Sequence, residues 1–270
     1  MNSSIHTSSP RKTCLRRLTT PRQVKARVIC FTWCGAGASV YRRFAPLLAS
    51  HIELIAVQLP GREERFSDPK FTRMDAILRH VLPELLALND APLCLFGHSM
   101  GAIVAYEMAL ALQMQTRPCT ALIVSGHASP EQRDHSHQTW HLANEDEFIA
   151  NIARLGGTPP DVLADRSIMR LFLPSLRADY EVLETYTRTR SLQLDCPLIA
   201  CAGKQDPEVS IESLAAWSNL SDAPFHSHWF EGDHFYLNSD PQSFALKLGT
   251  WIDDALQANK ATPERAQNVA

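Results

Sequence analysis

The sequence predicts an α/β protein in which a mostly parallel sheet is flanked by helices and interrupted by a helical insertion. Two patterns in its 270 residues support this prediction. From about residue 27, short apolar runs alternate with stretches of helical pattern, which is typical of β-α-β units and parallel sheets. The alternation stops at residue 129 and resumes near residue 193. A chain of this length fits either two domains or one α/β domain that carries an insertion.

The first half of the chain supplies four expected strands and two expected helices. The strands are the short apolar runs at residues 28–33, 54–59, 92–96 and 121–125. Helices are expected at residues 72–88, despite Pro83, and at residues 100–113, where Ala, Leu and Met favour helix.

The insertion, residues 130–192, is expected to be helical and to lie over the sheet as a lid. It contains no convincing strand, whereas residues 148–155, 167–173 and 176–186 have helical pattern. Lids gate access to a site and exclude water from it. Beyond the insertion, strands are expected at residues 197–202 and 225–230, and helices at residues 211–219 and 242–256. We therefore expect a core made of residues 26–129 and 193–258.

Both ends of the chain are expected to be tails outside this core. Seven Lys and Arg residues and no acid precede residue 28, in a stretch rich in Ser and Thr. Such polar termini cannot bury enough surface to become ordered. Residues 1–25 are therefore predicted to be a disordered basic tail, and residues 259–270 a flexible one. A transit peptide, which is also basic and poor in acids, is the alternative for the N-terminal segment.

Composition and charge exclude several classes of function. The net charge is −3, so no basic excess points to nucleic acid. No apolar run reaches the roughly 18 residues that a membrane span needs. The seven cysteines are odd in number and include no C-x-x-C pair, which fits buried free thiols better than a disulfide framework. We expect a cytoplasmic protein that binds neither nucleic acid nor membrane.

The strongest local signal is Gly97-His98-Ser99-Met100-Gly101, a G-x-S-x-G pattern between an expected strand and an expected helix. In this context the pattern forms a nucleophile elbow, in which glycines let the turn be sharp. Ser99 would then lie at a helix N-terminus, whose free N–H groups favour developing negative charge. The alternative is a serine that only caps the helix.

A serine hydroxyl needs a base to become a nucleophile, and with an elbow serine the partners follow in the order Asp or Glu, then His. Asp206 and His234 each lie in a loop after an expected strand, at the edge where active sites of parallel sheets gather. We expect His234 to take the Ser99 proton and Asp206 to orient the imidazole. Asp233 is the rival acid, but adjacent side chains rarely converge on each other.

An oxyanion hole requires two preorganised N–H donors. Met100, the residue after the nucleophile, is the expected first donor, and the loop after an early strand supplies the second. The Gly-rich segment Trp33-Cys34-Gly35-Ala36-Gly37 is that loop, with Cys34 as the expected donor and Gly35 as the next choice. A plain turn is the other interpretation of these glycines.

No metal or cofactor site is predicted. His135, His137 and His141 form a cluster, but a solvated loop is expected there, because the stretch is polar and no second cluster matches it. The sequence contains no P-loop, EF-hand or H-E-x-x-H motif.

Together these motifs resemble a stand-alone type II thioesterase of non-ribosomal peptide and polyketide synthesis, within the α/β-hydrolase superfamily. The chain is especially similar to the repair thioesterases of siderophore-type assembly lines. Five ordered segments carry the resemblance, at residues 31–39, 58–63, 97–101, 155–160 with 173–180, and 232–235. Thr32, Cys34 and Ala36 depart from the family's usual F-P-x-A-G-G-x-x-S pattern, and residues 1–25 are not covered.

The resemblance implies an α/β-hydrolase fold and a substrate class. Such enzymes hydrolyse acyl or aminoacyl groups from the phosphopantetheine arm of carrier proteins, and so clear mis-primed or stalled units. The implied partners are the carrier protein domains of a synthase. We expect a monomer that needs no cofactor.

Three other interpretations stay open, because a fold does not fix a function. One is a small-molecule carboxylesterase or lipase. Another is an acyltransferase or cyclase, in which an amine or alcohol intercepts the acyl-serine. The third is an inactive scaffold that only binds a carrier protein, and the complete Ser–Asp–His order speaks against it.

Overall fold

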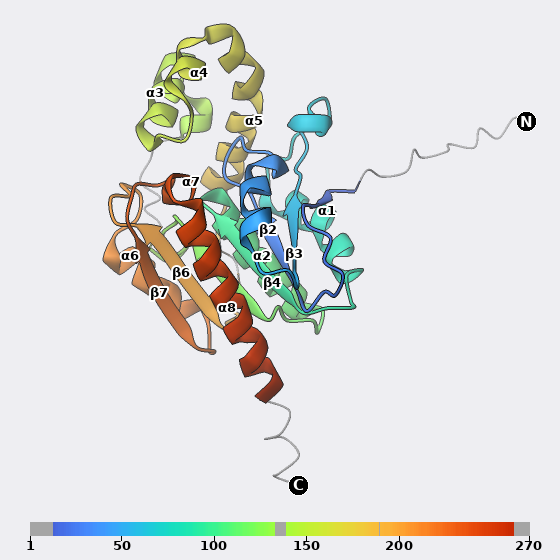
Figure 1. The fold of residues 1–270 in the computed structure, drawn as a ribbon. Helices are drawn as coiled ribbons and strands as arrows, with labels where there is room; N and C mark the ends of the chain where they lie inside the picture. Colours follow the sequence, from blue (N-terminus) through green and yellow to red (C-terminus); the bar gives the residue numbers. More distant parts are fainter. Residues whose placement is uncertain (1–12, 133–138, 189, 262–270) are drawn as a thin grey trace, which may run out of the picture.

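A computed structural model describes residues 13–132, 139–188 and 190–261, and these residues form one seven-stranded sheet flanked by helices (Figure 1). In spatial order the strands are β1 (Leu15–Arg17), β3 (Ile52–Val57), β2 (Ala26–Phe31), β4 (Leu93–His98), β5 (Ala121–Ser125), β6 (Leu198–Gly203) and β7 (Phe225–Phe230). The first pair, β1 with β3, is antiparallel, and the other pairs are parallel. The predicted mostly parallel sheet is therefore confirmed.

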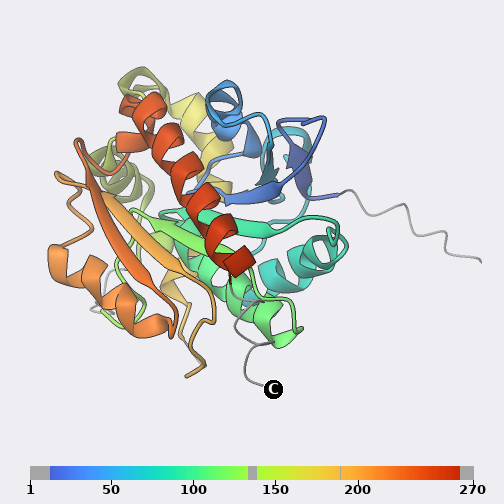
Figure 2. The same cartoon turned by 60° about the horizontal axis from the view of Figure 1, so that its bottom comes forward.

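Helices cover both faces of the sheet. They are α1 (Met74–Leu86), α2 (Met100–Met114), α6 (Ile211–Ala215), α7 (Tyr236–Ser239), α8 (Pro241–Ala261) and the 3-10 helices η1 (Ala38–Leu47), η2 (Glu63–Arg65) and η4 (Ala216–Leu220). Ile29 and Leu95 point to the face that packs on α1 and α2, whereas Val28 and Phe96 point to the face that packs on η1 and α8. Figure 2 shows α8 crossing its face of the sheet. Successive strand residues thus alternate between two buried layers.

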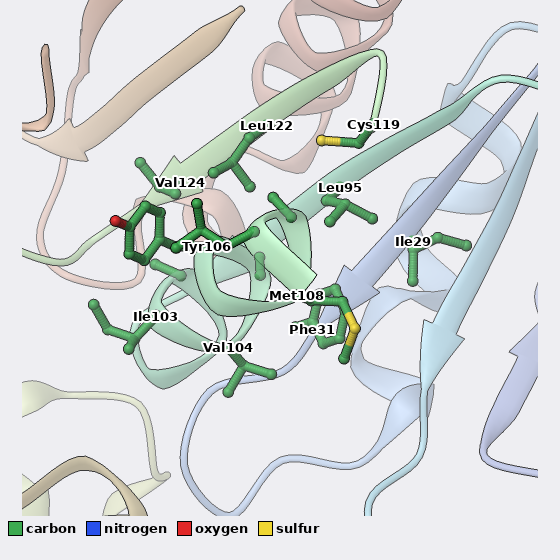
Figure 3. Packing of buried hydrophobic residues seen from close by; sticks show 14 of the residues in the cluster. Ile29, Phe31, Leu95, Ile103, Val104, Tyr106, Met108, Cys119, Leu122 and Val124 are labelled. Atoms are coloured by element: carbon green, nitrogen blue, oxygen red, sulfur yellow. The ribbon is translucent and has the colours of Figure 1, made fainter. Parts of the chain in front are cut away.

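The α2 helix is buried along nearly its whole length, from Met100 to Leu112. Its side chains pack against strand residues in one continuous layer, which Figure 3 shows for Ile103, Val104, Tyr106, Met108, Ile29, Leu95 and Val124. A helix that is apolar on all sides is stable only inside a core. The N-terminus of α2, directly after Ser99, is therefore held firmly by the packing around it.

Between β5 and β6, the described residues form four helices: η3 (Trp140–Leu142), α3 (Glu145–Leu155), α4 (Pro160–Ala164) and α5 (Arg166–Glu184). They gather beyond one end of the sheet (Figure 1). Phe148, Ile152, Met169 and Leu173 belong to a small apolar cluster of their own, separate from the two core layers. The α3–α5 segment thus has an apolar cluster of its own and also contacts the core, for example through Asp179 and Val182 of α5.

One expectation about this segment is wrong. The sequence analysis expects helical pattern at residues 167–173 and, as a separate stretch, at residues 176–186. A proline inside a helix removes a hydrogen bond and clashes with the preceding turn. Instead α5 is a single helix that contains Pro174. Buried side chains lie on both sides of the proline, among them Leu173 and Leu176, so packing of the two halves outweighs the local cost.

The expected tails also need correction. Within the predicted disordered tail, residues 1–12 lie outside the described residues, but residues 13–25 are ordered. Leu15 pairs with Val57 across β1 and β3, and Cys14 is fully buried. Arg17 forms an ion pair with Glu53 of β3, so the basic residues find acidic partners in the core. At the other end α8 continues to Ala261, and residues 262–270 lie outside the described part.

Among the described residues, no helix combines the length and the apolar character that crossing a membrane requires.

Candidate active site

Ser99 lies at a sharp turn between β4 and α2. Its backbone has φ 55° and ψ −121°, a region that residues other than glycine rarely occupy. The Ser99 N–H donates to the carbonyl of Ser125 at 2.8 Å, which ties the turn to the end of β5. This is the strained strand–turn–helix geometry of a nucleophile elbow, which lifts the hydroxyl above the sheet.

Both glycines of the motif are required by close backbone contacts. A Cβ on Gly97 would lie 1.8 Å from the carbonyl oxygen of Gly101, and a Cβ on Gly101 would lie 2.1 Å from the carbonyl oxygen of Phe31. No side chain fits at either position. The interpretation of Ser99 as a simple helix cap is not supported, because its side chain makes no capping hydrogen bond.

His234 and Asp206 meet in the loops after β7 and β6. The two side chains are almost completely buried, and His234 Nδ1 lies 2.9 Å from Asp206 Oδ2. Asp206 Oδ1 accepts the N–H of Glu208 at 2.9 Å, which orients the carboxylate. Within the described part of the chain, the other imidazole nitrogen of His234, Nε2, is buried and has no partner. Since Nδ1 is engaged by the carboxylate, Nε2 is the atom left to act as a base.

Asp233, the rival acid, has a different role. Its Oδ1 accepts the N–H of Phe235 at 2.8 Å, and so it shapes the turn that carries His234. The structure therefore brings Asp206, and not Asp233, to the imidazole. Ser99 and His234 line the same cavity, although no hydrogen bond joins them within the described residues. Catalytic hydrogen bonds are often long before substrate binds.

The loop expected to carry the second oxyanion donor is a tight turn. Ala36 N–H donates to the carbonyl of Trp33 at 3.1 Å, and Gly35 has φ 77°, which a type II turn requires at this position. Gly35 N–H donates to Asp179 Oδ2 at 2.7 Å, so it is not available to an oxyanion. In the part of the chain that the structure describes, the N–H groups of Cys34 and Met100 donate to no other residue. This supports Cys34 over Gly35 as the second donor.

The side chain of Cys34 lines the cavity, but its thiol is a poor nucleophile. Burial, together with the negative charge of Asp179, raises the pKa of Cys34 well above its ordinary value. A cysteine attacks as a thiolate, and this thiol stays protonated. The expected contribution of Cys34 to catalysis is its backbone N–H, which donates to the oxyanion.

His98 is a site residue whose contacts the sequence did not reveal. It lies in a buried chain, in which His98 Nδ1 is 2.8 Å from Ser125 Oγ and Ser125 Oγ is 2.6 Å from the hydroxyl of Tyr236. Its ring centroid is 5.0 Å from that of His234. Burial, and then the proximity of His234, lower the pKa of His98 well below its ordinary value. His98 is therefore neutral and supports the catalytic loop by packing.

The cavity that contains Ser99 and His234 has a volume of about 820 Å³. That size is in the range of small-molecule sites. Its walls come both from the strand-end loops and from the α3–α5 segment, and include Trp33, Trp140, Ile152, Leu176, Tyr180 and Phe235. The insertion thus forms the roof of a site whose lining mixes aromatic and aliphatic side chains with polar ones, such as Gln132, Glu184 and Glu208.

The histidine cluster singled out in the sequence is not assembled in the described residues. His135 and His137 lie outside them, and His141 Nδ1 is hydrogen-bonded to Glu184 of α5. One group with three potential metal-ligating atoms occurs elsewhere, formed by Cys14, His80 and Glu84. Glu84 already accepts the N–H of Cys14 at 3.0 Å and supports β1. It contributes nothing to the cavity described above.

Comparisons with known proteins agree with this geometry. The family model for the thioesterase domain matches residues 26–252. The chain is 35% identical to thioesterase PikA5 of Streptomyces venezuelae over 227 residues, which cover 83% of this chain and 80% of the relative. It resembles the structure of the type II thioesterase BorB from the borrelidin biosynthetic cluster, with TM-score 0.82, 31% identity and coverage of 92% of this chain and 100% of the other.

A second solved structure is nearly as similar. YbtT, a type II thioesterase from the yersiniabactin NRPS/PKS biosynthetic pathway, matches with TM-score 0.81 and 27% identity, over 90% of this chain and 100% of the other. The fold shared with these neighbours is the α/β-hydrolase fold, which confirms the fold that the sequence motifs implied.

Proposed function

The chain belongs to the thioesterase family, and from this premise we propose that it hydrolyses acyl or aminoacyl thioesters on the phosphopantetheine arm of carrier protein domains. Hydrolysis of this kind clears mis-primed or stalled units from an assembly line. Similarity to thioesterases of polyketide and non-ribosomal peptide pathways supports the substrate class.

In the proposed mechanism, Ser99 Oγ attacks the thioester carbonyl carbon while His234 Nε2 takes the hydroxyl proton. Negative charge collects on the carbonyl oxygen, to which the N–H groups of Met100 and Cys34 donate. The C–S bond then breaks, and the pantetheine sulfur leaves as a thiol with the proton from His234. Water attacks the acyl-serine with His234 again as base, which releases a carboxylic acid and restores Ser99.

The single observation that carries this proposal is the hydrogen bonding of the two ring nitrogens of His234. Its Nδ1 is engaged by Asp206, while Nε2 is buried, unpartnered among the described residues, and belongs to a side chain that lines the Ser99 cavity. His98 Nε2 is also buried without a partner among the described residues, but only His234 combines such a nitrogen with a carboxylate on Nδ1 and a place in the Ser99 cavity. A base that awaits the serine and its substrate accounts for it.

An esterase for small molecules is the alternative on the same fold. The test measures kcat/KM on an acyl-carrier protein, on the matching acyl-pantetheine and on a p-nitrophenyl ester of the same acyl group. A thioesterase of carrier proteins prefers the first substrate. A preference for the free ester would favour the esterase, and an amide or ester product in place of the acid would favour the acyltransferase or cyclase.

Carrier docking should depend mainly on apolar contacts. Three arginines of the insertion are candidates for charged contacts, but Arg166 and Arg170 pair with acids of α3, and Arg177 donates to the carbonyl of His141. Three apolar side chains at helical spacing on α5 are exposed instead, namely Ile168, Leu171 and Phe172. We infer that this face supports docking.

We therefore predict weak salt dependence for the carrier substrate, since screening acts mainly on exposed charge pairs. From low to moderate salt, kcat/KM for acyl-carrier protein should change little more than kcat/KM for acyl-pantetheine. A steep fall for the carrier substrate alone would show that local charges dominate docking. Equal efficiency on both substrates at every salt concentration would remove the protein contact altogether.

The insertion should open as a lid, and hydrogen exchange tests this. The α3 and α4 helices pack in a small cluster separate from the two core layers, so their local stability should be low. Their amides should exchange faster than those of β4 and β5. The C-terminal half of α5, which contacts the core loops, should be protected better than α3 and α4. Uniform protection of insertion and sheet would contradict a mobile lid.

A further inference from the structure

A buried ion pair joins the insertion to the core beside the oxyanion loop. Arg62 follows β3 and Asp179 lies on α5, and their side chains are 6% and 2% exposed. Arg62 Nη1 donates to Asp179 Oδ2 and Nη2 donates to Asp179 Oδ1, both at 2.8 Å. This bidentate geometry is the strongest that an arginine and a carboxylate form. Burying both charges is expensive, so such a pair is weak evidence for a role in stability alone.

The same pair also forms hydrogen bonds with the turn that contains Cys34. Asp179 Oδ2 accepts the N–H of Gly35 at 2.7 Å, and Arg62 Nη1 donates to the carbonyl of Ala36 at 3.3 Å. These contacts fix the peptide groups that follow Cys34. The Cys34 N–H lies one peptide earlier, so its direction depends on how the turn is held.

Other contacts of α5 and of the Arg62 loop strengthen the same junction. Leu176 of α5 lies so close to Gly35 that a Cβ there would be 2.6 Å from Leu176 Cδ2. The hydroxyl of Ser175 donates to the carbonyl of Gly61, beside Arg62. The side-chain amide of Gln58 donates to the carbonyl of Arg62 at 3.0 Å. The turn, the Arg62 loop and α5 therefore form one hydrogen-bonded unit.

We propose that Asp179 and Arg62 are positioning residues, which aim the Cys34 N–H at the oxyanion while α5 is docked on the core. The proposal rests on the proposed thioesterase function and deepens it. It makes α5 a part of the catalytic machinery as well as a wall of the pocket. When α5 leaves the core, the Gly35 N–H loses its acceptor and Arg62 and Asp179 no longer hold the turn in place. The oxyanion hole therefore forms only while the insertion covers the site.

Charge compensation is the reason that both residues are needed. A lone carboxylate one peptide away from the oxyanion donor would oppose the negative charge that develops in the transition state. Arg62 neutralises the charge of the Asp179 carboxylate, which still accepts the N–H of Gly35. A neutral acceptor can therefore replace part of the function of Asp179, whereas removing the side chain cannot.

The test compares Asp179→Ala, Asp179→Asn and a matched control, Glu53→Ala. Glu53 is equally buried and pairs with Arg27 in the sheet, away from the cavity. Each variant is measured with an acyl-pantetheine for kcat and KM. Each is also measured with a trifluoromethyl ketone analogue, which forms an oxyanion with the serine, and with a pantetheine thioether, which does not.

We expect Asp179→Ala to lower kcat and weaken the trifluoromethyl ketone by about 10²-fold, as loss of one oxyanion donor does. KM and binding of the thioether should stay within about threefold, because ground-state contacts are kept. Asp179→Asn, which retains an acceptor for Gly35 but not the charge, should have roughly a tenth of the wild-type kcat. Glu53→Ala should lose stability while its folded fraction keeps its kcat.

Equal weakening of both analogues in Asp179→Ala, or an unchanged kcat, would overturn the proposal. If Asp179→Ala does not fold, Asp179→Asn decides, and wild-type kcat with wild-type affinity for the ketone would overturn it. A wild-type protein that neither cleaves the thioester nor forms an adduct with the ketone would instead refute the proposed function. The two failures are therefore distinguishable.

Discussion

Replacing Ser99 with alanine should abolish thioester hydrolysis, with a rate loss on the order of 10⁴-fold or more. The serine is held in a strained backbone turn that makes sense only if its hydroxyl must project above the sheet. Its side chain makes no capping hydrogen bond, so the alanine variant should unfold at nearly the same temperature as the wild type. The measurement is kcat/KM on an acyl-pantetheine, together with thermal unfolding.

A fluorophosphonate probe provides the control for this variant. It should label the wild-type protein at Ser99, as peptide mapping would show, and it should not label Ser99→Ala. Near-normal turnover by a folded Ser99→Ala protein would rule out the serine mechanism. Labelling at another residue would identify a different nucleophile.

Asp206→Asn should lower kcat by about 10⁴-fold, by analogy with other triads in which the amide stabilises the wrong imidazole tautomer. The carboxylate accepts from His234 Nδ1 and so leaves Nε2 free to take the serine proton. An amide of the same size can donate to Nδ1 instead, which puts the proton of neutral His234 on Nε2. The loss should appear in kcat on acyl-pantetheine, with the fold intact.

Asp233→Asn is the matched control, because it changes the neighbouring acid in the same way. Asp233 Oδ1 accepts only the N–H of Phe235 in the part of the chain described here, and an asparagine oxygen can do the same. Its kcat should stay within about tenfold of the wild type, since the imidazole keeps its carboxylate. If the two effects were reversed in folded proteins, the assignment of Asp206 would be wrong.

The sequence was sufficient for those parts of the fold that depend on local pattern. The parallel strands and α2 lie where apolar runs and helix-forming residues predict them, because such runs have few other ways to be buried. Ser99, Asp206 and His234 follow from a motif and from loops after strands. Their roles in catalysis remain predictions that the variants above test.

The errors arose where distant residues decide the local structure. Leu15–Arg17 has little strand pattern and two arginines, yet it forms β1 by pairing with β3, and its arginines form ion pairs with Glu53 and Glu64. Residues 167–173 and 176–186 were expected as two helical stretches, but burial on both sides of Pro174 keeps α5 continuous.

The site contacts that the sequence did not indicate are equally non-local. Arg62 and Asp179 are 117 positions apart, and although both lie in segments that carry the family resemblance, nothing in the sequence pairs them. The chain from His98 through Ser125 to Tyr236 draws on three segments. Spacing along one sequence cannot reveal such pairs, since the fold alone brings them together.

Hydrolysis of carrier-bound thioesters is tested most directly by following the mass of an acylated carrier protein during incubation with the purified enzyme. The carrier should lose the mass of its acyl group and return to the free pantetheine form, with the acid as product. Ser99→Ala should leave the acylated carrier unchanged over the same time. A carrier that stays acylated with the wild-type protein, while a free ester is cleaved at Ser99, would contradict a carrier thioesterase and identify an esterase instead.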